Sequence, residues 1–191
     1  AISRRSLILG ALGTTRLADG FGEQSALAQT GTPRYVFLRG WGGTGTAVGR
    51  LDGPAGIAIF RNRVYVAESV NNRIQQFTRA GASVLTWGSA GRGNNQFNRP
   101  RGVAVDVDGD VYVVDSQNNR LQMFTPDGAF IQSIGSRGSG DGQFSTPWGV
   151  AIGRNDRIHV TDSQNHRVQV FSWRGDFIRS WGGRGAQQGQ F

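Results

Sequence analysis

Few side chains of this sequence belong to the types that carry out catalysis. It has two histidines, His159 and His166, and no cysteine among its 191 residues. A catalytic zinc site needs about three protein ligands and one open position, so two histidines do not complete one. No serine, histidine and acid stand at an interpretable catalytic spacing. The sequence therefore predicts no catalytic residue, no metal site and no cofactor.

Two other patterns resemble binding motifs, but each is incomplete. Residues 106–110 read DVDGD, like the start of a calcium loop, and lack the glutamate that such a loop carries further on. We interpret them as a hairpin turn. The glycine-rich runs 88–93 and 135–140 precede expected strands, so they lack the helix N-terminus that makes a phosphate cradle.

One phrase of twelve residues occurs three times. It reads VAESVNNRIQQF at 66–77, VVDSQNNRLQMF at 113–124 and VTDSQNHRVQVF at 160–171, a spacing of 47 residues. Within the middle repeat, four short runs separated by turn residues predict strands at 103–106, 111–115, 120–125 and 130–134. Four-stranded units that recur every forty to fifty residues are the blades of a β-propeller, so the fold class is all-β.

The repeated positions, PxGVAV, VYVxDSxNNRxQxF and GxFIxS, resemble the NHL repeat family of β-propellers. The resemblance implies repeats at 41–86, 87–133 and 134–180, the start of a fourth at 181–191, and a five- or six-bladed ring. Residues 29–40 are expected to be a linker with an outer closing strand at 35–39. Three blades leave two open edges. We favour a piece of a longer propeller, since the repeat stops within a unit; two copies closing a six-bladed ring are the alternative.

Arginine is the side chain that remains for function. All 21 basic residues are arginine, against 13 acidic residues, and the net charge is +8. Loops between blades and loops between the second and third strands should share one face. On that face the inter-blade residues predict an excess of four positive charges, whereas the opposite face balances. The residues counted are Arg50, Arg92, Arg99, Arg101, Arg137 and Arg184, with Asp52 and Asp141.

The acidic residue and the arginine of the repeated phrase, such as Asp115 and Arg120, are interpreted as a structural pair. The basic face then favours a non-catalytic scaffold that binds a protein, a glycan or another anionic ligand, because the guanidinium fork matches carboxylate and phosphate. The candidate partner-binding residues are Arg92, Arg137, Arg184, Trp148 and His166.

Two alternatives follow from the resemblance. The peptidyl-α-hydroxyglycine α-amidating lyase is a propeller with similar repeats and a zinc ion held by three histidines, and His166 stands where one such ligand could sit. Some NHL domains bind RNA through a basic face, but exposed aromatic residues for stacking bases are sparse in this sequence.

The first 28 residues resemble a twin-arginine export signal. Arg4 and Arg5 precede a mildly apolar stretch at 7–15, and the triplet Ala26–Ala28 stands before Gln29 like a signal-peptidase site. No stretch has the 18 or so apolar residues of a membrane span. We therefore expect a protein exported to the periplasm or the outside of the cell, beginning at Gln29; a disordered polar arm on a cytoplasmic protein is the alternative.

Overall fold

The computed structural model describes residues 36–191, so the expected export signal lies outside the described residues. Residues 39–191 form one compact unit of three four-stranded antiparallel sheets. Blade 1 contains β1 (Pro54–Phe60), β2 (Arg63–Glu68), β3 (Arg73–Thr78) and β4 (Ser83–Trp87). Blade 2 contains β7 (Pro100–Val105), β8 (Val111–Asp115), β9 (Arg120–Phe124) and β10 (Phe130–Ile134). Blade 3 contains β13 (Pro147–Ile152), β14 (Ile158–Asp162), β15 (Arg167–Phe171) and β16 (Phe177–Gly182).

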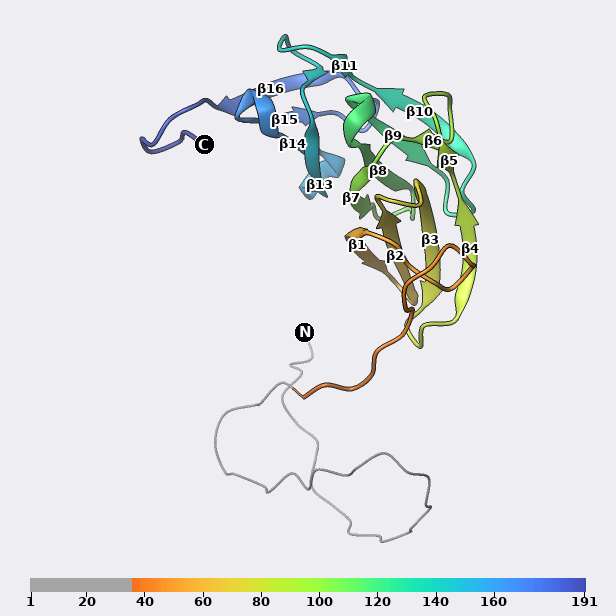
Figure 1. The fold of residues 1–191 in the computed structure, drawn as a ribbon. Helices are drawn as coiled ribbons and strands as arrows, with labels where there is room; N and C mark the ends of the chain where they lie inside the picture. The colour runs from red at the N-terminus through yellow and green to blue at the C-terminus, as the bar shows by residue number, and fades with distance from the viewer. Residues whose placement is uncertain (1–35) are drawn as a thin grey trace, which may run out of the picture. The chain divides into compact units, whose positions relative to one another are not determined.

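The blades follow one another around an arc, with their first strands on the inner side (Figure 1). β7 lies against both β1 and β13, so the three sheets are stacked radially, as in a propeller. The loops between blades carry short parallel pairs: β5 (Ser89–Ala90) with β6 (Gln96–Phe97), and β11 (Ser136–Arg137) with β12 (Gln143–Phe144). Three short 3₁₀ turns complete the structure: η1 (Ser116–Asn118), η2 (Arg154–Asp156) and η3 (Ser163–Asn165).

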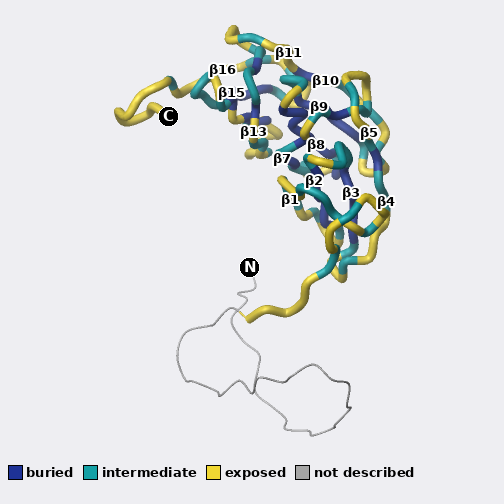
Figure 2. The backbone as a smooth tube through the Cα atoms, in the orientation of Figure 1, coloured by how far each residue is buried: buried dark blue, intermediate teal, exposed yellow. Residues whose placement is uncertain are grey.

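The core lies between blades, and strand alternation decides which side chain faces which neighbour. In β8, Val111 and Val113 pack toward blade 1, whereas Tyr112 and Val114 pack toward blade 3. Successive side chains of a strand point to opposite faces, so one β-branched and aromatic run serves two interfaces. Figure 2 shows the buried positions concentrated along these middle strands.

Glycine allows the inner strands to approach closely. A Cβ built on Gly102 of β7 would lie 2.8 Å from the Trp148 carbonyl oxygen and 2.9 Å from the Val150 nitrogen, both in β13. A Cβ on Gly56 of β1 would overlap the carbonyl of Arg101 in the same way. The inner strands of neighbouring blades therefore touch through their backbones.

The predicted architecture is confirmed: β8 and β10 have the expected bounds, and β9 ends one residue earlier. β7 begins three residues earlier than expected, at Pro100, and ends one residue earlier, at Val105. Residues 36–40 form no strand in this structure, although 35–39 were expected to be one. An extended segment gains ladder hydrogen bonds only beside another strand. Within the described residues, no helix is long and apolar enough to cross a membrane.

Candidate functional site

A buried carboxylate holds each inter-blade loop in place. In blade 2, Asp115 is fully buried and accepts hydrogen bonds from the Asn98 backbone N–H at 2.7 Å, from Asn118 Nδ2 at 2.8 Å and from Arg120 Nε at 2.8 Å. Burial raises the pKa of the Asp115 carboxyl, and these three hydrogen bonds oppose that rise. Arg120 Nη2 continues to the carbonyls of Gly93 and Gln96 in the loop before β7.

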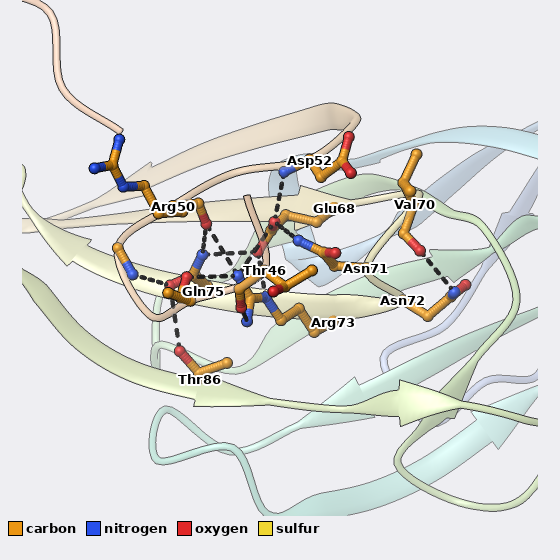
Figure 3. A network of polar contacts seen from close by, with 12 residues as sticks. Thr46, Arg50, Asp52, Glu68, Val70, Asn71, Asn72, Arg73, Gln75 and Thr86 are labelled. Carbon is orange, nitrogen blue, oxygen red and sulfur yellow. Dashed lines mark hydrogen bonds and ion pairs between the residues drawn. The ribbon is translucent and has the colours of Figure 1, made fainter. Parts of the chain in front are cut away.

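The same arrangement recurs in the other two blades. In blade 1, Glu68 accepts from the Asp52 N–H, from Asn71 and from Arg73, as Figure 3 shows. In blade 3, Asp162 accepts from the Ser145 N–H, Asn165 and Arg167. The structural interpretation of the acid–arginine pair is thus confirmed.

A further side chain of this network, a glutamine, was missed by the sequence analysis. Gln122 is fully buried in β9, donates to the Gln96 carbonyl at 2.7 Å, and accepts from the Asn95 N–H at 3.1 Å. Gln75 and Gln169 occupy the equivalent positions. The same glutamine recurs at an inward-facing position of the third strand in every repeat. Because a buried amide needs hydrogen-bond partners, this recurrence could have predicted a place in the network.

His166 lies at the corner that ends the 3₁₀ turn η3. Its φ is 51° and its N–H donates to the Ser163 carbonyl. The equivalent residues Asn72 and Asn119 have the same left-handed backbone, and their Oδ1 atoms accept from the next loop, at Arg99 N and Thr146 N. Asparagine and histidine tolerate this backbone better than most residues. The position of His166 is therefore a structural corner.

The structure brings two of the candidate arginines together. A cavity of about 220 Å³ lies between the two inter-blade loops on either side of the blade 2 turn. Arg92 comes from the loop before blade 2 and Arg137 from the loop after it, and both are exposed. The lining residues are Arg92, Gln117, Asn118, Asn119, Arg120 and Arg137, and we call this cavity the blade 2 pocket.

The position of this pocket follows from the register of the repeat. Arg92 aligns with Thr46 and Ser139, whereas Arg137 aligns with Ala90 and Arg184. At these two loop positions, the turn between the second and third strands of blade 2 is therefore flanked by two arginines. The corresponding turn of blade 3 is flanked by one arginine, and that of blade 1 by none. Arg120 is neutralised by Asp115, so Arg92 and Arg137 supply the net positive charge. Two separated guanidinium groups beside polar turn side chains suit an anionic ligand.

The remaining candidates lie elsewhere. Trp148 is in β13 and 51 % exposed, and the guanidinium carbon of Arg101 stacks 3.4 Å from its ring centroid. Arg101 was counted among the loop residues, but it lies within β7. Arg184 follows β16 and does not line the blade 2 pocket. His159 packs edge-on against Trp181, 5.8 Å between ring centroids, and across residues 36–191 no three His, Asp or Glu are grouped to hold a metal ion.

Two family models match the chain. The model described as DUF5128, 6-bladed beta-propeller, matches residues 104–181, and the NHL repeat model matches residues 51–77. A search of curated proteins found no match.

Solved structures show the same fold. An inactive virginiamycin B lyase from Staphylococcus aureus, solved with quinupristin, is 20% identical with a TM-score of 0.52, covering 65% of this chain and 40% of the lyase. A Bacteroides fragilis protein described as a candidate exported protein is 17% identical with a TM-score of 0.55, covering 73% of this chain and 40% of that one. The chain thus spans about two fifths of the length of each of these proteins. The matched models and the three radial sheets show that residues 39–191 have the fold of a β-propeller, and that residues 51–77 within it are similar to the NHL repeat.

Proposed function

We propose that this chain is a non-catalytic interaction scaffold that binds an anionic protein, glycan or other anionic ligand through its inter-blade loop face. The blade 2 pocket carries the proposal, because it places Arg92 and Arg137 on either side of one cavity. The loop that presents Arg92 is held by the buried network around Asp115 and Gln122, and the loop that presents Arg137 is held by the equivalent network around Asp162 and Gln169. Little conformational entropy is then lost when a ligand binds.

Hydrogen bonds to the blade 2 turn hold the loops that carry Arg92 and Arg137, which distinguishes this pair from arginines scattered over a surface. Asn118 Nδ2 donates to the Gly91 carbonyl, one residue before Arg92, and Asn119 Oδ1 accepts from the Thr146 N–H in the loop that also carries Arg137. Both loops are therefore tied to the same turn, at 117–120. A ligand anion between them would accept charge-assisted hydrogen bonds from two planar forks.

The test is binding to heparin fragments and to polyglutamate, measured by isothermal titration at several salt concentrations. We expect Arg92→Glu with Arg137→Glu to weaken binding at least about tenfold, since each lost charged hydrogen bond is worth roughly 1.5–3 kcal/mol. Arg61→Glu with Arg154→Glu, an equal charge change on the opposite face, is the control. Equal losses in both double variants would contradict the proposal.

Two further binding measurements test the extent of the binding face and the RNA-binding alternative. Arg184→Glu alone measures how far binding extends beyond the blade 2 pocket along the same face. Single-stranded RNA, used as a third probe, should bind more weakly than heparin; tighter binding of RNA would favour the RNA-binding alternative.

We also propose that residues 1–28 direct export, on the pattern of Arg4-Arg5, the apolar stretch and Ala26–Ala28. N-terminal sequencing of the protein after expression in a bacterium with a twin-arginine pathway should give Gln29 as the first residue. An unprocessed chain that stays in the cytoplasm would contradict this.

A further inference from the structure

The guanidinium of Arg120, which lines the blade 2 pocket, is fixed through two of its three nitrogens. Nε donates to Asp115 Oδ2 at 2.8 Å, and Nη2 donates to the Gly93 and Gln96 carbonyls at 2.7 and 2.9 Å. The side chain is only 13 % exposed. Within residues 36–191, Nη1 donates no hydrogen bond, so this nitrogen keeps its N–H groups for a ligand.

The same nitrogen has a different environment in the other blades. In blade 1, Arg73 Nη1 donates to the carbonyl of Thr46, the residue that aligns with Arg92 (Figure 3). In blade 3, Nη1 of the equivalent Arg167 is also without an acceptor in the described chain, but one arginine and not two flanks that turn. Among the three described blades, blade 2 alone therefore combines an unused Nη1 with two flanking guanidinium groups.

The blade 2 pocket carries a net positive charge of two. Arg92 and Arg137 are exposed and form no ion pair within the described residues, whereas Arg120 is paired with Asp115. Asp141 lies in the loop that carries Arg137, but it is exposed and does not line the cavity. Three guanidinium charges and one carboxylate charge thus leave an excess of +2.

A phosphate monoester matches this arrangement in charge and in shape. It carries about −1.5 to −2 charge at pH 7 and has three terminal oxygens, so guanidinium groups from three chain segments can each take a different oxygen. A carboxylate has one charge and two oxygens, which a single guanidinium fork satisfies. The cavity of about 220 Å³ is smaller than the roughly 300–1,000 Å³ of small-molecule sites, which suits one group carried on a larger molecule.

We propose that the blade 2 pocket binds the phosphoryl group of a phosphate monoester, with Arg120 Nη1 as the fixed donor and Arg92 and Arg137 on either side. This assignment rests on the proposed function and narrows its anionic ligand to one chemical class. The same group occurs on protein side chains and on sugars, and the experiment separates these two sources.

The test is isothermal titration of the full 191-residue chain with two matched pairs of probes. One pair is a phosphoserine peptide and the same peptide with glutamate in place of phosphoserine; the other is glucose 6-phosphate and glucuronate. We expect a phosphate probe to bind at least about tenfold more tightly than its carboxylate counterpart, and the pair with the larger difference identifies the source. Equal binding of phosphate and carboxylate in both pairs would overturn the assignment and leave the proposed function standing.

Arg120→Lys tests the fixed donor. Lysine keeps the positive charge beside Asp115 but has a single nitrogen, so no second nitrogen is left for the ligand. We expect the preference for phosphate over carboxylate to fall to within about twofold. Arg167→Lys makes the same change in the equivalent network of blade 3 and should lose a similar amount of stability while keeping the full preference. A preference reduced equally in both variants would contradict a direct role of Arg120.

Two variants of exposed side chains keep the test independent of folding. Arg92→Gln and Arg137→Gln should each weaken binding of the phosphoserine peptide by about tenfold and that of the glutamate peptide by less than about threefold. Arg154→Gln, on the opposite face, should change neither. Equal losses for the two peptides would mean that these arginines supply charge without selectivity, and would overturn the assignment.

The pH dependence of binding gives a further readout. A phosphate monoester gains its second charge near pH 6, so the phosphoserine peptide should bind several-fold more tightly at pH 7.5 than at pH 5. The glutamate peptide ionises near pH 4 and should change little. Neither histidine lines the cavity, and a change of charge at Asp115 or Asp141 would alter both peptides alike. A phosphoserine affinity that stays flat from pH 5 to 7.5 would contradict recognition of the doubly charged group.

Discussion

Substituting alanine for glycine on the inner strands should be harmful where a neighbouring blade is present and harmless where it is not. Gly102 has ordinary strand geometry, but its Cβ would lie 2.8 Å from the Trp148 carbonyl oxygen and 2.9 Å from the Val150 nitrogen. Gly149 is the equivalent position in blade 3, and its Cβ would meet only the Thr161 side chain, at 3.2 Å. Real Cβ atoms essentially never approach other atoms within 3.0 Å.

In Gly102→Ala, β7 and β13 must separate by several tenths of an ångström. Both obstructing atoms are backbone, and they cannot rotate away as a side chain can. Overpacking of this kind typically costs about 1–3 kcal/mol. For a folded region of this size each kcal/mol lowers Tm by about 2–4 °C. Gly149→Ala should be neutral, or stabilising by up to about 1 kcal/mol through the lower entropy of its unfolded chain.

The assay is urea unfolding followed by circular dichroism, with each substitution made singly in the wild-type chain. We expect Gly102→Ala to lower the midpoint with an unchanged slope. A loss of stability in Gly149→Ala as large as in Gly102→Ala would refute the argument, since the cost would then come from alanine in a strand and not from the neighbouring blade.

Two further predictions concern polar groups in blade 2. Asp115→Ala should lower the free energy of unfolding by about 3–5 kcal/mol, because it leaves Arg120 without the carboxylate of a buried pair; Asp127→Ala, at an exposed turn, is the control, and similar losses in both would contradict this. The Tyr112 hydroxyl donates to Asp106 Oδ2 at 2.8 Å, and desolvation and this hydrogen bond raise the pKa of Tyr112. The unfolded chain therefore ionises first, near pH 10, so stability is full below that pH and falls as the pH rises above it. Tyr112→Phe should lose about 1 kcal/mol near pH 7 and unfold less steeply with alkali; an unchanged alkaline slope would contradict the assignment.

Most of the fold could be predicted from local pattern. Alternation places Val111 and Val113 on one side of a strand and Tyr112 on the other, and turn residues set the strand ends, so the blades follow from the order of residues. The shifted start of β7 could not be predicted, because Pro100 joins the strand only by pairing with Asp115 across an irregular register.

The candidate site was only partly predictable. Sequence reasoning placed Arg92 and Arg137 on one face but did not single out blade 2. It also grouped Trp148 and His166 with them, whereas Trp148 stacks with Arg101 on the inner strands and His166 forms a turn corner. The missed glutamines were visible as repeated letters, but their burial depends on a loop that folds back from the preceding blade.

The amino-acid order alone determined the three blades and their strands, and the positive charge of the inter-blade loops. These properties depend on short-range alternation and on a fixed period, which act along the chain. Tertiary structure alone decided that Arg92 and Arg137, 45 residues apart in the sequence, share one cavity. It also decided that Ile57 is exposed where Val103 is buried. Both depend on how whole sheets stack around an axis, which cannot be predicted from the residues that neighbour each position in the chain.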